Sequence, residues 1–570
     1  MSLSRALVLL VSGVLLCLPA AVQSQKPAAG VARAPFGTMP DGKPVEAANC
    51  VKLRKLSTHG ANMFRRGSVV VCLVLLAAGC ASLPENYPKP ASMAEAPSAE
   101  TALGAIVAEA SSRYQDQSGF ALITGGRRAF TSRIALTDLA ERTIDVQYYI
   151  WDSDTTGRML AERLVRAADR GVRVRILIDD LATAGRDPVM ATVDAHPNIE
   201  VRVFNAFANR GMRSLDFLSD MDRVNHRMHN KMMIFDNAAA IIGGRNVADI
   251  YFQVATDANY RDLDIAAVGP IVPTASHVFD HFWNGEWSVP ISALVDEDYT
   301  QADLDRLVSQ ARGKIREGDF PYPLDAEAVA AAEGLPSIMG RLVWAPGVIV
   351  WDDPADMDQG QVAGKIMRDL IAKVDTLEHE LLIESAYFVI PDLGEERIGQ
   401  LVDRGVRVRV LTNSLESNDV IAAHAGHAAH REDLIAKGVE MYEFKADAET
   451  VEKDLFPMRS RAALHTKAIA FDRNSIFVGS FNLDPRSAAI NTEAGIYVES
   501  PELAADLADY MDDGILPESS YHVTLDENGE LIWTTKTDGQ HVELREEPGT
   551  SFGRRFMVRL INVLPIEHLL

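Results

Sequence analysis

Cysteine is nearly absent from the chain. Only four of the 570 residues are cysteine, and all four lie within the first 80 residues. A disulfide framework or a cysteine-based metal site is therefore excluded from the rest of the chain. The length is sufficient for two to four domains and a large core. The composition, with 47% hydrophobic and 24% charged residues, is that of a globular protein.

Basic residues are also scarce relative to acidic ones. The chain has 56 Lys and Arg against 80 Asp and Glu, which gives a formal net charge of −24 at pH 7. Nucleic acid selects basic surfaces, because binding releases counterions from the phosphates. We therefore expect no nucleic-acid partner, although a local basic site is compatible with this charge.

Two apolar runs near the N-terminus have the anatomy of export signals. Residues 1–25 combine Arg5, an apolar stretch and small residues at a plausible cleavage point. A second signal begins at Met63 and contains an apolar run of ten residues, 69–78, shorter than the ~20 that span a bilayer. It ends in "LAAGC", which resembles the lipobox of bacterial lipoproteins, with Cys80 as the lipidated residue. Ala77 departs from this pattern, which prefers Leu there.

Two tandem export signals are not needed in one protein. We therefore interpret Met63 as the true start, residues 1–62 as a non-native or mis-annotated extension, and 63–80 as a lipoprotein signal peptide. The alternative is that Met1 is genuine and that residues 63–80 form a buried apolar segment. Residues 81–114, which begin with a stretch rich in Pro, Ala, Ser and Glu, are expected to form a flexible tether.

The body of the chain contains an internal repeat. "HNKMMIFD" at 229–236 returns as "HTKAIAFD" at 465–472, with the same spacing of His, Lys and Asp. In a strand the His and the Lys share one face, whereas the Asp has the opposite parity. "RGVRVR" occurs upstream of both copies, at 170–175 and 404–409. The strand, helix, strand pattern around it predicts parallel crossover units in an α/β fold.

The correspondence continues downstream of both motifs. "IIGGRNVAD" at 241–249 matches "IFVGSFNLD" at 476–484, and "DLDIAAVGP" at 262–270 matches "EAGIYVESP" at 493–501. We therefore expect two similar domains at 115–290 and 341–515, a helical connector at 291–340, and a C-terminal hairpin and helix at 516–570. The pairs that this register sets opposite one another are Gly243 and Gly479, Gly244 and Ser480, Asn246 and Asn482, and Asp262 and Glu493.

Paired H-x-K-x4-D motifs, each followed by G-[GS]-x-N, resemble those of the phospholipase D superfamily. "QYYIW", "RGVRVRILIDDL" and "GGRN" are similar to bacterial cardiolipin synthases, and the ending "PGTSFGRRFMVRLINVLPIEHLL" resembles their C-type branch. The resemblance covers roughly residues 115–570. It implies two phospholipase-D-like α/β domains, with mixed sheets flanked by helices, related by pseudo-twofold symmetry around one shared active-site cleft.

The residue types suit phosphodiester chemistry. One histidine attacks phosphorus to form a phosphohistidine, and the other protonates the leaving alkoxide and later deprotonates the acceptor. The family implies His229 as nucleophile and His465 as acid–base, whereas the sequence alone leaves their order open. The lysines and Asn residues would stabilise the phosphorane, and no metal or other cofactor is required. The candidate catalytic motif residues are His229, Lys231, Asp236, His465, Lys467 and Asp472, and the supporting ones are Gly244, Asn246, Ser480 and Asn482.

The carboxylates of this set have different expected roles. Asp262 and Glu493 are candidates to orient the imidazoles through their far nitrogens. Asp236 and Asp472 have the opposite strand parity, so we interpret them as structural residues that anchor the strand ends although they belong to the motif.

Three other features allow two interpretations each. The histidines of "HAGHAAH", namely His424, His427 and His430, form a zinc site or, as we prefer, a helical surface near the cleft. Residues 413–419, "NSLESND", line a head-group pocket or form a polar loop. The terminal helix, with Phe552, Phe556 and Arg559, contacts lipid or docks on the body.

The leading functional interpretation is an enzyme that transfers phosphatidyl groups, with cardiolipin as product. The alternatives are a phospholipase D-type hydrolase or nuclease that uses water as acceptor, and a non-catalytic lipid-binding lipoprotein. The expected partners are phospholipids, with phosphatidylglycerol and phosphatidylethanolamine as candidates, and a membrane surface; no obligate protein partner is inferred. The expected location is the bacterial cell envelope, with a lipid anchor and the enzyme facing the periplasm.

Overall fold

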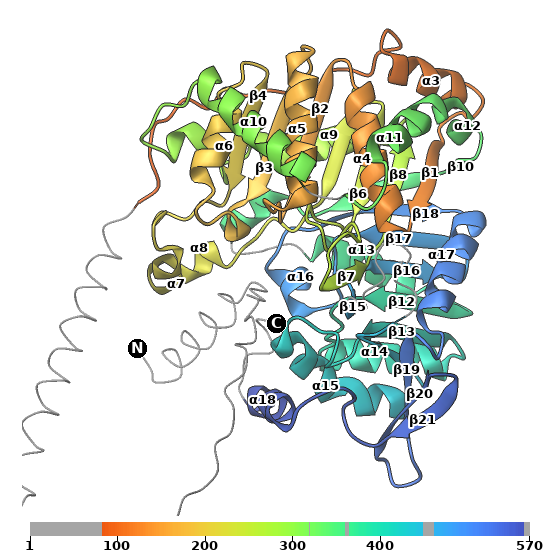
Figure 1. Cartoon of the computed structure of the whole chain (residues 1–570). Helices are drawn as coiled ribbons and strands as arrows, with labels where there is room; N and C mark the ends of the chain where they lie inside the picture. The colour runs from red at the N-terminus through yellow and green to blue at the C-terminus, as the bar shows by residue number, and fades with distance from the viewer. Residues whose placement is uncertain (1–81, 318–319, 360–363, 449–460, 564–570) are drawn as a thin grey trace, which may run out of the picture.

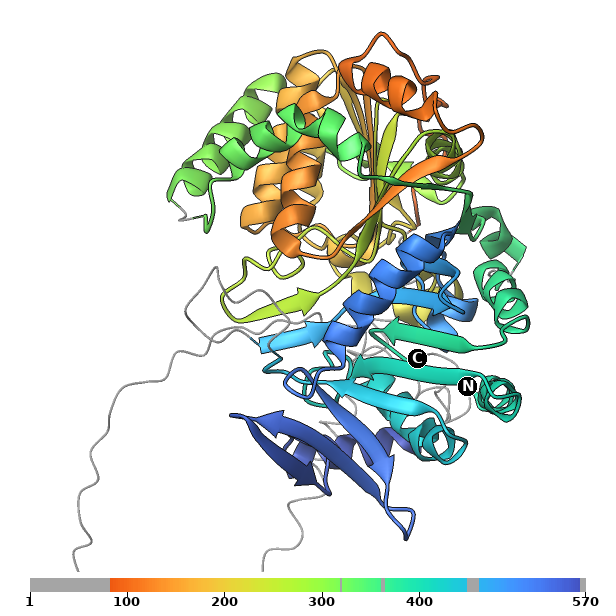
Figure 2. The same ribbon diagram turned by 90° about the vertical axis from the view of Figure 1, so that its right-hand side faces the viewer.

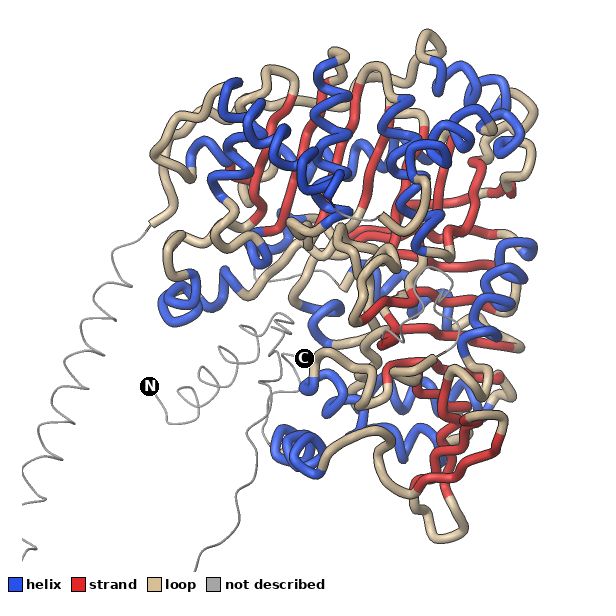
Figure 3. Tube along the Cα trace, viewed as in Figure 1, coloured by secondary structure: helices blue, strands red, loops and turns tan. Residues whose placement is uncertain are grey.

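The computed structural model describes residues 82–317, 320–359, 364–448 and 461–563. They form two α/β halves, each built on one mixed sheet with helices on both faces (Figure 1). In Figure 3 the strands of the two halves run in different directions, up the page in the first half and across it in the second. Residues 1–81, which include both predicted export signals and Cys80, lie outside the described residues.

The first half has a nine-stranded sheet of order β10-β1-β8-β6-β5-β2-β3-β4-β9. Its strands are β1 (Ser118–Ile123), β2 (Thr143–Tyr148), β3 (Arg173–Asp179), β4 (Ile199–Phe204), β5 (Met232–Phe235), β6 (Ala239–Gly243), β8 (Asp264–Val268), β9 (Ser288–Pro290) and β10 (Val343–Ala345). Its helices are α3 (Ala102–Ser111), α4 (Gly126–Leu139), α5 (Thr155–Asp169), α6 (Asp187–Asp194), α7 (Asp216–Ser219), α8 (Met221–Val224), α9 (Ile271–Asn284), α10 (Gln301–Glu317), α11 (Leu324–Glu333) and α12 (Leu335–Met339).

The second half has a ten-stranded sheet of order β11-β18-β17-β16-β12-β13-β14-β19-β20-β21. Its strands are β11 (Gly347–Trp351), β12 (Glu380–Ser385), β13 (Arg407–Asn413), β14 (Glu440–Phe444), β16 (Lys467–Phe471), β17 (Ser475–Gly479), β18 (Ala494–Glu499), β19 (Ser520–Leu525), β20 (Leu531–Thr537) and β21 (Gln540–Leu544). Its helices are α13 (Lys365–Val374), α14 (Asp392–Asp403), α15 (Ile421–Ala436), α16 (Pro485–Ala489), α17 (Pro501–Gly514) and α18 (Phe552–Asn562).

The predicted duplication is visible in these strand orders. The run β8-β6-β5-β2-β3-β4 of the first sheet matches the run β18-β17-β16-β12-β13-β14 of the second. In both, three parallel strands continue into three antiparallel ones, beginning with the strand that follows the motif histidine. The predicted α/β fold with two mixed-sheet domains is therefore confirmed.

Two glycines explain why "RGVRVR" occurs twice. Gly171 follows α5 with φ +97°, and Gly405 follows α14 with φ +89°. A left-handed residue ends a helix at low cost only when it is glycine. The chain then enters the alternating strands β3 and β13. The repeated hexapeptide thus marks the same helix-to-strand turn in both halves.

A shared apolar core joins the halves. One cluster of buried side chains contains residues of β6 and β8 together with residues of β17 and β18, and it extends to α9 and α17. Helix α9 also contacts β11, and α17 contacts β1. The halves are therefore packed against each other through apolar side chains, and this fixes the position of one motif relative to the other.

Residues 82–114 correct the expectation of a flexible tether. The backbone around Ser92 accepts hydrogen bonds from Arg175 at 2.8 Å and from the side chain of Asn284 at 3.0 Å. The indole of Trp283 donates to the Ser92 hydroxyl at 2.8 Å. Buried arginines and tryptophan hold this segment in place, and composition alone does not reveal these long-range partners.

One expected boundary changes. The second domain was expected to begin at residue 341, but β10 pairs with β1 of the first sheet, so the second sheet begins with β11 at Gly347. The expected connector forms α10, α11 and α12, which pack on α4, α5 and α3 of the first half. The expected hairpin is a three-stranded meander, β19–β21, at the edge of the second sheet, shown in dark blue at the bottom of Figure 2. Among the described residues, no helix has the length and apolarity needed to cross a membrane.

Candidate active site

The segments that carry the two motif histidines cross between the halves. Strand β7 (Ala258–Arg261) of the first half pairs in parallel with β15 (Arg461–Leu464) of the second. Directly after β15, the His465 amide donates to the Arg261 carbonyl at 2.8 Å. On the other side, the His229 amide donates to the Thr492 carbonyl at 2.9 Å. The backbone of each motif histidine is thus bonded to the opposite half.

The side chains repeat this crossing. Nδ1 of His229 lies 2.9 and 3.0 Å from the two carboxylate oxygens of Glu493. Nδ1 of His465 lies 2.6 Å from Oδ2 of Asp262. The hydrogen bonds that the repeat register predicted for Asp262 and Glu493 are therefore present, and each joins a histidine to a carboxylate of the other half. This arrangement leaves Nε2 of each ring for a reacting group.

The motif lysines are buried beside the histidines. Lys231 is 1% exposed and Lys467 is 2% exposed, and each ammonium donates to the backbone carbonyl of the histidine two residues earlier. Burial lowers the pKa of both lysines, well below its usual value for Lys231, and the nearby Glu493 and Asp262 offset this only in part. Two buried lysine side chains next to two histidines form a site that can bind a phosphate anion.

Both imidazoles have depressed pKa values. Burial is the largest cause for His229, and the charges of Lys231, Lys467 and His465 lower its pKa further. Burial and then the charge of Lys467 lower the pKa of His465 to about 4. Because Lys467 and His465 belong to the second half, their effect on His229 puts both pairs in one electrostatic environment. At neutral pH the rings are neutral, the form that a histidine nucleophile requires.

The two orienting carboxylates differ in charge. Burial opposes the ionisation of Asp262, but the charge and hydrogen bond of His465, together with Arg245, hold its pKa below the usual value. Burial raises the pKa of Glu493 to about 7, and Lys231 and the Ser480 hydroxyl offset this only in part. The carboxylate beside His465 is thus ionised, whereas the carboxylate beside His229 is partly protonated near neutral pH.

The residues of the two G-[GS]-x-N motifs support these carboxylates. A Cβ atom on Gly244 would lie 2.2 Å from Oδ1 of Asp262, so only glycine leaves room for that carboxylate. At the equivalent position, the Ser480 hydroxyl donates to Glu493. Asn246 and Asn482 are buried. Asn246 accepts the Ile150 amide at 3.1 Å, and Oδ1 of Asn482 has no hydrogen-bond partner among the described residues.

Asp236 and Asp472 lie at the far ends of β5 and β16 from the histidines. The Asp236 carboxylate accepts the backbone amides of Glu141, Arg142 and Thr143 at 2.8 to 3.2 Å. Asp472 accepts the equivalent amides of residues 378–380 at 2.7 to 2.9 Å. These contacts fit strand-anchoring residues, as their parity indicated, and among the described residues neither carboxylate bonds a motif histidine.

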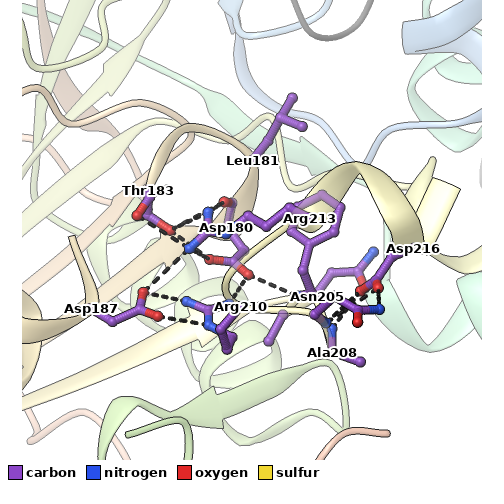
Figure 4. Close-up of polar contacts among 12 residues, drawn as sticks. Asp180, Leu181, Thr183, Asp187, Asn205, Ala208, Arg210, Arg213 and Asp216 are labelled. Atoms are coloured by element: carbon purple, nitrogen blue, oxygen red, sulfur yellow. Dashed lines mark hydrogen bonds and ion pairs between the residues drawn. The ribbon is translucent and has the colours of Figure 1, made fainter. Parts of the chain in front are cut away.

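A polar network holds the loop that leads to His229. Asp180, after β3, accepts the Phe207 amide at 2.7 Å and pairs with Arg210 and Arg213 (Figure 4). The preceding residue, Asp179, accepts the Met228 amide at 2.9 Å. The carboxyl end of β3 thus fixes both ends of the segment between β4 and the first motif.

Aromatic rings that were not among the predicted site residues surround the two histidines. The ring of Tyr149 meets His229 edge-on at 4.9 Å, and Tyr251 and Tyr260 lie 5.0 and 5.1 Å from His465. Tyr260 and Tyr387 donate their hydroxyls to the two carboxylate oxygens of Asp419, at 3.2 and 2.8 Å. "QYYIW" and "NSLESND" were the available signals, because they contain Tyr149 and Asp419.

The histidines of "HAGHAAH" correct the expectation of a helical surface. They lie on the buried face of α15, between 0 and 8% exposed. Each faces a different carboxylate: His424 lies 3.5 Å from Glu547, His427 lies 3.2 Å from Glu443, and His430 lies 3.1 Å from Glu395. Among the described residues, the compact group of potential metal ligands contains only His430 of the three, with Asp392 and Glu395, so these histidines do not converge on one ion.

Comparison with known proteins agrees with this geometry. A family model described as "Cardiolipin synthase, PLD-like domain" matches residues 134–283 and 370–514. The chain is 36% identical to cardiolipin synthase C of Escherichia coli K12 over 475 residues, which is 82% of this chain and 99% of that protein. It is 30% identical to an uncharacterised protein of Helicobacter pylori over 86% of this chain and 97% of that one.

Among solved structures, the phosphatidylserine synthase of Haemophilus influenzae Rd KW20 is similar over 80% of this chain and 99% of that one. The TM-score is 0.50 and the identity is 12%, so the likeness concerns the fold.

Proposed function

The chain belongs to the phospholipase D superfamily, in the family of cardiolipin-synthase-like domains, and on that premise we propose that it is a phosphatidyltransferase whose product is cardiolipin. The observation that carries the proposal is the crossed pair of hydrogen bonds, His229 with Glu493 and His465 with Asp262. It provides two oriented imidazoles beside two buried lysines, which is what a two-step phosphoryl transfer requires.

In the first step Nε2 of His229 attacks the phosphorus of a donor phospholipid. The phosphorus–nitrogen bond forms as the bond to the head-group oxygen breaks, and His465 gives its proton to that leaving oxygen. Binding of the anionic phosphodiester favours the protonated form of His465, because it offsets the lysine charges that depress its pKa. Lys231 and Lys467 stabilise the negative charge on the phosphorane oxygens.

In the second step His465 removes the proton of an acceptor hydroxyl. That oxygen attacks the phosphohistidine and breaks the phosphorus–nitrogen bond, which regenerates His229. With phosphatidylglycerol as acceptor the product is cardiolipin, and the released head group is glycerol or ethanolamine according to the donor. Asp262 would stabilise the imidazolium that forms at His465, because it is ionised and 2.6 Å away.

The location forms part of the proposal. We propose that Cys80 carries a lipid anchor and holds the enzyme in the bacterial envelope, facing the periplasm. The support is the sequence "LAAGC" after the apolar run that begins at residue 69. Mass spectrometry of the N-terminus is expected to find acylated Cys80 as the first residue. A peptide from residues 26–62 would contradict this start.

The test of the activity is a lipid profile in a bacterial strain without cardiolipin synthases of its own. Expression of the chain is expected to restore cardiolipin, and expression of His229→Ala at the same level is not. Accumulation of phosphatidic acid without cardiolipin would show that water is the acceptor and would overturn the synthase proposal.

A further inference from the structure

Helix α18 carries an exposed apolar stripe. On its inner side Val558 and Ile561 pack against Leu415 and against Ala422 and Ala425 of α15. In Figure 1 α18 lies beside α15 at the lower left of the second half. On its outer side five large apolar side chains face solvent: Phe552 (76% exposed), Phe556 (53%), Met557 (43%), Leu560 (47%) and Val563 (80%). The other exposed apolar side chains of the described residues are dispersed over many elements.

The charge of this helix is opposite to that of the whole chain. The sequence "FGRRFMVRLIN" has three arginines and no acidic residue, whereas the chain has a formal net charge of −24. Arg555 pairs with Glu546 at 3.0 Å, and Arg559 is exposed to solvent beside the apolar stripe. An apolar stripe flanked by arginine matches the boundary between acyl chains and anionic head groups in a bilayer.

The helix is connected to the catalytic site by direct contacts. Arg554 donates to the Asn418 carbonyl at 2.6 Å. The next residue, Asp419, accepts the hydroxyl of Tyr260, whose ring lies 5.1 Å from that of His465. A lipid surface at α18 is thus linked to the acid–base histidine through one loop, 413–419.

We propose that α18 docks the protein on an anionic phospholipid bilayer, with the stripe from Phe552 to Val563 inserted below the head groups and Arg559 at the phosphates. The choice of a bilayer rests on the proposed phosphatidyltransferase function, since the substrates then lie in that surface. The docking brings the exposed end of the loop 413–419, at Asp419, near the membrane surface.

The experiment uses the full chain with Cys80→Ser, which removes the acylation site, and vesicles of phosphatidylethanolamine and phosphatidylglycerol. Hydrogen exchange of residues 552–562 is expected to slow roughly tenfold or more when vesicles are added. The variant Phe552→Ser with Phe556→Ser should bind these vesicles at least tenfold more weakly. The matched control is Leu393→Ser on α14, which removes an apolar side chain that is 82% exposed and is expected to leave binding unchanged.

Two outcomes would overturn the docking. In one, the protein binds vesicles while exchange in residues 552–562 stays the same, so another segment is responsible. In the other, these residues are already protected without vesicles, so a part of the chain or a second copy covers the stripe. Turnover of a short-chain, water-soluble phosphatidylglycerol measures the proposed transferase activity without a membrane, and so tests it separately from the docking. The double variant should keep that turnover and lose activity on vesicles, whereas a wild type inactive on both lipids would refute the transferase and leave the docking result intact.

Discussion

The two histidine sites are copies of one motif, yet their surroundings differ. On the His465 side the orienting carboxylate is Asp262, whose pKa lies below its usual value. On the His229 side it is Glu493, whose pKa burial raises to about 7. A charged carboxylate stabilises an imidazolium more than a partly neutral one does. The difference favours His465 as the ring that carries a proton and His229 as the neutral nucleophile.

The support for each carboxylate differs in the same way. Asp262 occupies the space that a side chain on Gly244 would take, and it interacts with the buried Arg245. Glu493 instead accepts the Ser480 hydroxyl, a neutral donor. The duplicated backbone therefore fixes where the histidines lie. The non-equivalent neighbours determine how readily each orienting carboxylate is protonated.

The largest effect is expected from the histidines themselves. His229→Ala and His465→Ala should each reduce phosphatidyl transfer by about 10⁴-fold or more, and the double variant should be no worse than either, because the two rings act as a unit. With an activated phosphodiester whose leaving group needs no proton, only His465→Ala should accumulate an enzyme that carries the phosphoryl group with its remaining ester on His229, detected by mass spectrometry. Phosphorylation of His465 in the His229→Ala variant would reverse the two roles.

The second effect concerns the non-equivalent pair Gly244 and Ser480. Gly244→Ser should lower kcat/KM by about 10²-fold or more, because the new side chain displaces Asp262 from His465. Ser480→Gly removes one hydrogen bond to Glu493 and should cost about tenfold or less. Both variants are first checked for folding by circular dichroism. Equal losses would mean that the two carboxylates are equivalent after all.

The third effect is a difference in pH dependence between the carboxylates. Glu493 is protonated more readily in the folded protein, so the wild type loses stability as pH rises from about 4.5 through 7. In Glu493→Gln this loss is absent, so its unfolding free energy relative to wild type should improve by about 3 kcal/mol between pH 4.5 and 8.5.

Asp262 has the opposite sign. Its lowered pKa stabilises the folded state above pH 3.8, and this stabilisation is lost only as pH falls below that value. The deficit of Asp262→Asn should therefore be constant from pH 5 to 8.5. Thermal unfolding of both variants over this range is the measurement. A parallel improvement of both variants with pH would contradict the assigned difference.

The smallest effect on catalysis is expected from the strand-anchoring residues, whose loss should lower stability instead. Asp236→Ala leaves three backbone amides without an acceptor at a buried site and should destabilise the protein by about 2–4 kcal/mol. Asp472→Ala should cost less, about 1–2 kcal/mol, because two of its three amide contacts are exposed to solvent. Urea unfolding measures both. Retained kcat in the folded fraction separates an anchoring role from a catalytic one, and Asn at either position should recover part of the stability.

Much of this architecture was readable from the sequence. The repeat of "RGVRVR" and of the two histidine motifs predicted two α/β halves, and the downstream register paired Asp262 with Glu493. Strand parity separated Asp236 and Asp472 from the histidines. These features are local, because periodicity and spacing act within one strand or one turn. The exact start of β5 was not predicted: His229 precedes the strand, which begins at Met232.

Only the tertiary structure decided which groups meet. The carboxylate that bonds each histidine comes from the other half. Glu493 is 264 residues from His229, and Asp262 is 203 residues from His465. A symmetrical repeat permits pairing within a half or across halves, and the choice depends on how the sheets pack through α9 and α17. Packing also placed residues 82–114 against Arg175 and Trp283. Burial then set the proton affinities, because the free energy of a charge depends on the surroundings that the whole fold creates.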